Sequence, residues 1–324
     1  MSELSRIKSP IKEELGEFER HFRRSLKSSV PLFDIITNYI LRKKGKQIRP
    51  TFVLLTARML GEISASTYTA ASLIELLHTA SLIHDDVVDE SYERRGFFSI
   101  NALWKSKVAV LAGDFLLAKG LLLSVETKEY ELLEIVSVAV KDMAEGELLQ
   151  IQKSRKLNIS MTEYFEIIRK KTAALIAACT ASGAKSAGVD SEKINVMRDF
   201  GELTGIAFQI KDDLFDYERN AKIGKPTAND IKEKKMTLPL IYALEVCPSN
   251  DKKKILSIIK HYNRNTDKID EVISFVKNYG GLEFAEMKML EYKNSALEKL
   301  EIFPDSDSKK SLISLLDFTI NRKE

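Results

Sequence analysis

Two short acidic motifs are the residues of this chain best suited to chemistry. The first, IHDDVVD, runs from Ile83 to Asp89, and the second, IKDDLFD, runs from Ile210 to Asp216. Both follow the pattern Ile-x-Asp-Asp-apolar-apolar-Asp. Residues four apart lie on the same face of a helix, so the first and third aspartates of each motif project together. Each motif therefore predicts a pair of carboxylates on one helix face.

Carboxylates at this spacing call for a positive partner. They destabilise an isolated helix by about 0.2 to 0.5 kcal/mol per pair, and burial among apolar residues adds to the cost. Mg²⁺ suits such oxygen ligands, because proteins hold it through one or two carboxylates together with substrate phosphates and water. The pattern predicts metal-bound diphosphate, with the candidate ligands Asp85, Asp86, Asp89, Asp212, Asp213 and Asp216.

The six aspartates are not expected to act alike. One helix face cannot direct all three carboxylates of a motif at the same ion, so we expect Asp85, Asp89 and Asp212 to bind metal directly. The other three aspartates are expected to contact water and neighbouring groups. The alternative, in which each motif is an acidic helix end in water, is weakened by the presence of two matching copies in apolar surroundings.

Long helices are expected to position the two motifs. Only 14 glycines and 7 prolines occur among 324 residues, and apolar residues recur at spacings of three and four. No linker rich in Pro, Gly or Ser divides the chain, which predicts an all-α protein with a single domain over residues 1–324. Segment 220–236 reads as a polar loop that could close over a site. The pattern predicts helices over 10–42, 51–60, 66–90, 108–123, 129–152, 161–182, 192–218, 238–246, 253–261, 269–279, 282–300 and 309–321.

Composition narrows the function classes. Lys and Arg number 50 against 47 Asp and Glu, so no overall field indicates a nucleic-acid partner. Cys179 and Cys247 lack metal-ligand spacing, and the first residues carry many charges, so we expect a cytoplasmic protein without an export signal. Segment 108–125 is apolar but contains Asp114 and Lys119, and we interpret it as a buried helix with no transmembrane role.

Together with the basic element Gly45-Lys46-Gln47-Ile48-Arg49-Pro50, the acidic motifs resemble those of the trans-isoprenyl diphosphate synthases, or polyprenyl synthetases. The resemblance spans about residues 45–322 and is strongest to long-chain members such as the octaprenyl diphosphate synthases. It implies the isoprenoid synthase fold, a single large helical bundle around a central cavity. It also implies a Mg²⁺-dependent prenyltransferase of isoprenoid biosynthesis, with three ions when substrate is bound.

The same resemblance implies two substrate subsites. Isopentenyl diphosphate would be bound by Lys46, Arg49, His78 and Arg95. The allylic diphosphate would be bound by Arg94, Lys171, Thr172, Gln209, Lys225 and Lys235. Lys171 and Lys225 join Asp85, Asp89 and Asp212 as the candidate catalytic residues. Glu147 and Gln150, in a Gly-Glu-x-x-Gln element, match a further family position that a surface polar pair would explain equally well.

The polar loop departs from the family pattern at two positions. Ala228 and Lys234 stand where glycines are usual, although Gly-Lys-Pro at 224–226 and Thr-Leu-Pro-Leu at 237–240 match. Backbone geometry at these two positions is therefore open.

Product length is expected to depend on the residues one turn before the first motif. Ala80 and Ser81 are small, and Leu77 lies one turn deeper. Where short-chain members place an aromatic plug, small residues leave room for further condensations, so the resemblance implies a product of about C30–C45. Small residues also allow tight helix packing, so a short-chain farnesyl or geranylgeranyl diphosphate synthase remains an alternative.

Other readings of the motifs differ in class. A terpene cyclase would usually carry an Asn/Ser/Glu-rich second metal site, and a non-catalytic subunit of a prenyl synthase usually lacks intact motifs. A purely structural helical protein is a third alternative. The expected partners are isopentenyl diphosphate, an allylic diphosphate of the farnesyl or geranylgeranyl type, and a second subunit in a homodimer. Release of product at a membrane surface is also expected.

Overall fold

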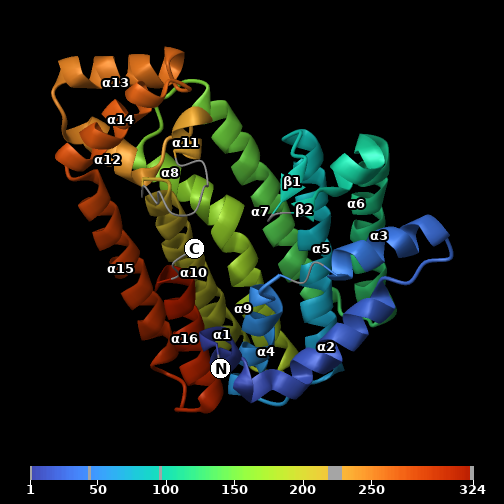
Figure 1. Cartoon of the computed structure of the whole chain (residues 1–324). Helices are drawn as coiled ribbons and strands as arrows, with labels where there is room; N and C mark the ends of the chain where they lie inside the picture. Colours follow the sequence, from blue (N-terminus) through green and yellow to red (C-terminus); the bar gives the residue numbers. More distant parts are fainter. Residues whose placement is uncertain (1, 43–44, 95–96, 218–227, 322–324) are drawn as a thin grey trace. The chain divides into compact units, whose positions relative to one another are not determined.

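The computed structural model describes residues 2–42, 45–94, 97–217 and 228–321 (Figure 1). These residues are almost entirely helical, and their only strands, β1 (Glu93–Arg94) and β2 (Phe97–Phe98), pair antiparallel. The all-α prediction is confirmed.

The chain divides into two compact units. The first unit contains residues 1–140, 178–198 and 302–315, and the second contains 141–177, 199–301 and 316–324. Four of the five boundaries lie inside helices, which are α7 (Tyr130–Ser154), α9 (Ala174–Ser186), α10 (Ser191–Phe215) and α16 (Asp307–Asn321), and the fifth follows the end of α15 (Gly281–Leu300).

The first unit is built around α5 (Ala65–Val88), which carries the first acidic motif at its end. Leu73, Ile74 and Leu76 of this helix are fully buried, as predicted for a central helix. Helix α6 runs beside α5 (Figure 1). The other elements of this unit are α1 (Glu3–Ile7), the 3₁₀ turn η1 (Ser9–Ile11), α2 (Lys12–Ser25), α3 (Pro31–Arg42), α4 (Ile48–Leu60) and α6 (Ile100–Glu126).

Helix α6 corrects the prediction of a buried helix at 108–125. It buries a narrow stripe of small residues that includes Ala109, Ala112 and Gly120. Its opposite side exposes the apolar side chains of Leu103, Val110, Leu111, Leu121, Leu122 and Val125. By length and composition, α6 is the one helix in the described ranges that could cross a membrane, a criterion that a long core helix also meets.

The second unit holds the second acidic motif, at the end of α10. Its remaining helices are α8 (Met161–Ile168), the π-helical turn η2 (Arg169–Ala173), α11 (Asn229–Lys232), α12 (Leu238–Val246), α13 (Ser249–His261), α14 (Thr266–Asn278) and α15 (Gly281–Leu300). Helix α8 begins in a capping box, because the Ser160 hydroxyl accepts from the Glu163 amide at 3.3 Å and the Glu163 carboxylate accepts from the Ser160 amide at 2.9 Å.

Two predicted helices are broken in the structure. The helix expected over 10–42 is split into η1, α2 and α3. Residues 26–30 separate α2 from α3, and α3 begins at Pro31, a residue type that is favoured at a helix start. The helix expected over 161–182 changes to a π-helical turn at 169–173. Such single π turns occur frequently at functional sites, and this one contains Lys171 and Thr172.

Candidate active site

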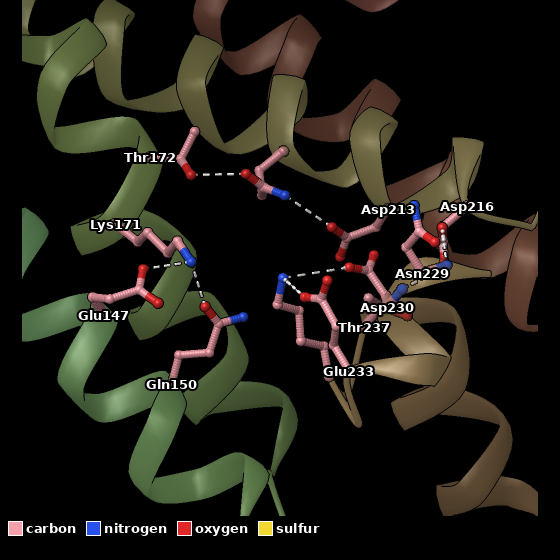
Figure 2. Close-up of polar contacts among 12 residues, drawn as sticks. Glu147, Gln150, Lys171, Thr172, Asp213, Asp216, Asn229, Asp230, Glu233 and Thr237 are labelled. Atoms are coloured by element: carbon pink, nitrogen blue, oxygen red, sulfur yellow. Dashed lines mark hydrogen bonds and ion pairs between the residues drawn. The ribbon is translucent and has the colours of Figure 1, made fainter. Parts of the chain in front are cut away.

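The second unit contains a pocket of about 90 Å³ in which several predicted site residues meet. Lys171 and Thr172 reach it from η2, and Gln209 and Asp213 reach it from α10 (Figure 2). Lys235 lines the pocket from the segment before α12. The pocket brings these residues together, and their binding roles stay predictions.

Lys171 is held by the Gly-Glu-x-x-Gln element of α7. Its ammonium donates to Gln150 Oε1 at 2.6 Å and pairs with Glu147 Oε2 at 2.5 Å (Figure 2). A Cβ atom added to Gly146 would lie 2.7 Å from the Lys171 amide nitrogen, so only glycine lets the two backbones approach this closely. The element therefore positions a pocket lysine, and Gln150 itself lines the pocket.

A chain of hydrogen bonds leads from η2 to the second acidic motif. Thr172 donates to Gln209 Oε1 at 2.7 Å, and Gln209 Nε2 donates to Asp213 Oδ1 at 2.9 Å (Figure 2). The buried hydroxyl of Tyr164 donates to the other oxygen, Oδ2, of Asp213 at 2.7 Å. Both carboxylate oxygens of Asp213 thus accept from protein groups.

Acidic groups accumulate around this pocket. Burial raises the pKa of Asp213 to about 6, although hydrogen bonds from Gln209 and Tyr164 lower it. Burial, together with the negative charges of Asp213 and Asp216, raises the pKa of Asp230 to about 7. Lys235 pairs with Glu233 at 2.5 Å and lies 3.9 Å from Asp230 (Figure 2). A bound cation would relieve the repulsion among these carboxylates.

Asp216 caps the short helix α11. Its two oxygens accept from the amides of Asn229 and Asp230, at 2.8 and 2.9 Å. The loop positions that lack the usual glycines, Ala228 and Lys234, have φ values of 63° and 59°. Both backbones therefore adopt the left-handed conformation that glycine would provide without strain.

The aspartates of the two acidic motifs differ in burial and in hydrogen-bond partners. Asp213 is buried and bonded through both oxygens, and Asp216 is bonded to backbone amides, whereas Asp212 is half-buried. In the first unit, Asp85 and Asp89 are exposed on one side of the end of α5, while Asp86 is buried. The exposed carboxylates have hard oxygen donors of the kind that Mg²⁺ prefers.

The described part of the chain contains no ready cluster of metal-ligating side chains. Among the residues that the structure describes, no three His, Cys, Asp or Glu side chains lie close enough together to hold a metal ion. The assignment of metal ligands stays a prediction.

The first unit carries the predicted residues for isopentenyl diphosphate. Lys46 is exposed immediately before α4, and Arg49 is half-buried in its first turn. His78 is buried in α5. Arg94 belongs to β1, whereas Arg95 and Lys225 lie outside the described residues. The roles of all six residues stay predictions.

The three predicted chain-length residues lie on α5. Ala80 and Leu77 are buried, and Ser81 is half-buried with its hydroxyl donating to the His78 carbonyl at 2.9 Å. A Cβ atom added to Gly120 of α6 would lie 3.4 Å from Leu77 Cδ2. Leu77 therefore lies within contact distance of α6 at Gly120.

Sequence reasoning missed Tyr164 and Asp230. Tyr164 lies seven residues before Lys171, two helical turns away, so helical spacing could have placed both on one stripe. Asp230 is an acid in a lysine-rich loop with no periodic pattern, and only the folded chain brings it beside Asp213.

Comparison with known proteins gives the family. The family model described as polyprenyl synthetase matches residues 30–276. The short chain isoprenyl diphosphate synthase of Methanothermobacter thermautotrophicus is 35% identical over 292 residues, which cover 89% of each chain. The crystal structure of a decaprenyl diphosphate synthase from Rhodobacter capsulatus has a TM-score of 0.93 and 32% identity, and covers 99% of each chain.

A second solved structure is similar over nearly the full length. The polyprenyl synthase from Caulobacter crescentus, complexed with calcium and isoprenyl diphosphate, has a TM-score of 0.89 and 33% identity, and the match covers 99% of this chain and 98% of that one. These relatives are prenyl diphosphate synthases, which act on isoprenoid diphosphates with divalent metal. The chain therefore belongs to the polyprenyl synthetase family of prenyltransferases and has the all-α isoprenoid synthase fold.

Proposed function

We propose that this prenyltransferase is an all-trans polyprenyl diphosphate synthase. It would condense isopentenyl diphosphate repeatedly, head to tail, with an allylic diphosphate of the farnesyl or geranylgeranyl type. The observation that carries the proposal is the pocket of the second unit, where Lys171, Thr172 and Lys235 supply phosphate-binding donors beside the second acidic motif.

The proposed reaction needs one group of residues for the allylic diphosphate and another for isopentenyl diphosphate. Breaking the C1–O bond of the allylic diphosphate leaves an allylic cation, which the double bond of isopentenyl diphosphate attacks before a proton is lost. Lys171, Lys225 and Lys235 would neutralise the released diphosphate. Lys46 and Arg49, with His78 and Arg95, would hold the second substrate. The released diphosphate would accept the proton, so no protein nucleophile is required.

Mg²⁺ is the proposed cofactor, with three ions when substrate is bound. Asp85, Asp89 and Asp212 would hold it: the side chains of Asp85 and Asp89 are exposed and that of Asp212 is half-buried. Bound Mg²⁺ would stabilise the negative charge that develops on the leaving diphosphate. The Caulobacter crescentus relative, which binds calcium and isoprenyl diphosphate, supports a divalent metal at this kind of site.

The proposed product is long, about C30–C45. Small side chains at Ala80 and Ser81 support this length, as does the similarity to a decaprenyl diphosphate synthase. The short-chain alternative is supported by the similarity to the short chain isoprenyl diphosphate synthase of Methanothermobacter thermautotrophicus. Product analysis separates the two.

We further propose a cytoplasmic homodimer that releases its product at a membrane surface. The exposed apolar side of α6, formed by Leu103, Val110, Leu111, Leu121, Leu122 and Val125, is a face that a second copy of the chain would cover. Sedimentation equilibrium of the purified chain tests the dimer, and a monomer at micromolar concentration would contradict it.

A condensation assay tests the proposed function. Radiolabelled isopentenyl diphosphate is incubated with the purified chain, Mg²⁺ and either farnesyl or geranylgeranyl diphosphate, and the products are separated by length. Products of about C30–C45 that disappear when EDTA removes the metal are expected. A parallel reaction with dimethylallyl diphosphate as a C5 primer tests the short-chain alternative, which products that stop at C15 or C20 would favour. No product with any of the three primers would favour a non-catalytic subunit.

A further inference from the structure

The N-terminal helices contact the basic element that precedes α4. The Lys8 ammonium donates to the backbone carbonyl oxygen of Lys46 at 2.8 Å. The side-chain amide of Gln47 donates to Glu19 Oε1 at 3.1 Å. Two groups from the first 20 residues therefore hold the two consecutive residues of the Lys46–Gln47 peptide.

This peptide has a conformation that needs support. Gln47 is the N-cap of α4 and has φ 52° and ψ 38°, in the left-handed region. For a residue with a Cβ atom, that region costs about 1 to 2 kcal/mol. Thr51 holds the following side, because its amide and hydroxyl donate to the Gln47 carbonyl at 3.1 and 2.7 Å. Lys8 and Glu19 complete the set of contacts that keep the peptide in this geometry.

Lys8 and Glu19 lie at either end of a segment that packs against α4. Ile11 and Phe18, which lie between Lys8 and Glu19 in the chain, are buried, and both η1 and α2 pack against α4. Burial lowers the pKa of Lys8, while the charge of Glu19 raises it. Glu19 thus offsets part of the cost of placing an ammonium group at this carbonyl.

We propose that Lys8 and Glu19 are positioning residues for isopentenyl diphosphate, because they fix the Lys46–Gln47 peptide and so orient the side chain of Lys46 toward the phosphate oxygens. The inference rests on the proposed function, in which Lys46 and Arg49 bind that substrate. Neither Lys8 nor Glu19 touches substrate in this proposal; both act through Lys46.

The chain offers a matched control for the helix contact itself. Glu14 of α2 forms an ion pair with Arg58, near the other end of α4. E14Q loosens the same two helices without touching Lys46 or Gln47. Lys12 and Glu13 are exposed on α2, so K12M and E13Q control for the change of charge.

The first experiment compares steady-state kinetics of the full chain. K8M and E19A are expected to raise the KM for isopentenyl diphosphate about 5- to 10-fold, the range of one lost hydrogen bond. The KM for the allylic substrate and kcat are expected to stay within about 2-fold of wild type. K8R, which keeps the donor, and E19Q, which keeps the acceptor for Gln47, are expected to recover most of the loss. Equal changes in both KM values, or in E14Q as well, would overturn the proposal.

A double-mutant cycle separates positioning from stability. If Lys8 acts through Lys46, K8M has little further effect on the KM in a K46Q background, because the oriented group is already gone. Additive effects of the two substitutions, with a lowered melting temperature, would show a merely structural role and reject the inference.

Binding of inorganic pyrophosphate, measured by isothermal titration calorimetry, keeps the inference testable without turnover. Wild type that binds pyrophosphate but forms no product would refute the proposed function alone, and the inference would then be judged on weaker binding by K8M than by K12M. Absence of pyrophosphate binding by wild type, or equal binding by K8M and K12M, would refute the inference.

Discussion

The hydroxyl of Tyr164 donates a hydrogen bond of 2.7 Å to Oδ2 of Asp213, and both groups are buried in the second unit. Since Gln209 bonds the other carboxylate oxygen, Asp213 is held from two sides. The middle aspartate of the second motif is thereby engaged by protein donors through both of its oxygens.

Tyr164→Phe tests this contact. Removing the donor from a buried carboxylate is expected to lower the free energy of unfolding by about 1 to 3 kcal/mol, measured by urea denaturation at neutral pH. Tyr292→Phe is the control, because the half-buried Tyr292 packs its ring on Phe165 at 5.4 Å. Equal stability losses in the two variants would contradict the role of the hydroxyl.

Asp85→Asn tests the assignment of direct metal ligands. The side chain is exposed, so folding should be unaffected, while Mg²⁺-dependent condensation should fall at least about 100-fold, more than for loss of a group behind a ligand. Initial rates and thermal melting measure the two effects. Glu126→Gln, on the exposed end of α6, should change neither. Wild-type activity in Asp85→Asn would exclude this aspartate as a ligand.

Ala80→Phe and Ser81→Phe test the determinants of product length. A phenyl ring at either position should block elongation and shift the products toward shorter chains. Ala80 is buried, so overpacking should also cost about 1 to 3 kcal/mol. Mass spectrometry of the reaction products gives the distribution. Ala118→Phe, at an exposed position of α6, is the comparison, and an unchanged distribution in the Ala80 and Ser81 variants would exclude the proposed tunnel.

His21 gives the fold a predicted pH dependence. Its Nδ1 lies 3.0 Å from Ser72 Oγ, and burial, aided by the Arg24 charge, lowers the pKa of the imidazole. The unfolded chain, with a His pKa of about 6.5, therefore binds more protons than the folded chain at acidic pH. Stability contributed by neutral His21 is present above about pH 6.5 and is lost as the pH falls through and below that value.

Urea denaturation at several pH values between about 5 and 8 measures this effect. His21→Gln should remove the component of stability that rises with pH in that window. The raised pKa values of Asp213 and Asp230 contribute a component of opposite sign, which the variant keeps. Substitution of His261, which is exposed, should leave the slope as it is in wild type. If His21→Gln keeps the full slope, another group causes it.

Lys234→Gly tests the strain in the polar loop. At φ 59° a side chain with a Cβ atom is strained, so Lys234→Gly should be more stable than Lys234→Ala by about 1 kcal/mol. Both variants lose the same bond from the Lys234 ammonium to the Lys260 carbonyl, of 2.9 Å, so the difference isolates the backbone. Equal midpoints in thermal melting would argue against strain at this position.

Local pattern was sufficient for most of the fold. Helical spacing predicted α5, α10 and α12 to α16 with shifts of a few residues at their ends, because a 3.6-residue period depends only on neighbours along the chain. It failed at η2, where the apolar pattern continues through 169–173 while the hydrogen bonding changes. It also failed at α6, where several large apolar side chains are exposed to solvent. Apolar character by itself does not tell which face another element covers.

The sequence by itself determined the family and was sufficient to predict the chemistry, because paired acidic motifs with basic elements at fixed spacing depend only on residue type and order. Tertiary structure decided which side chains hold them in place. Tyr164 beside Asp213, Gln150 beside Lys171, and Lys8 beside the Lys46 carbonyl are separated by 49, 21 and 38 residues. Such contacts depend on how helices pack, since no local period relates residues so far apart in the chain.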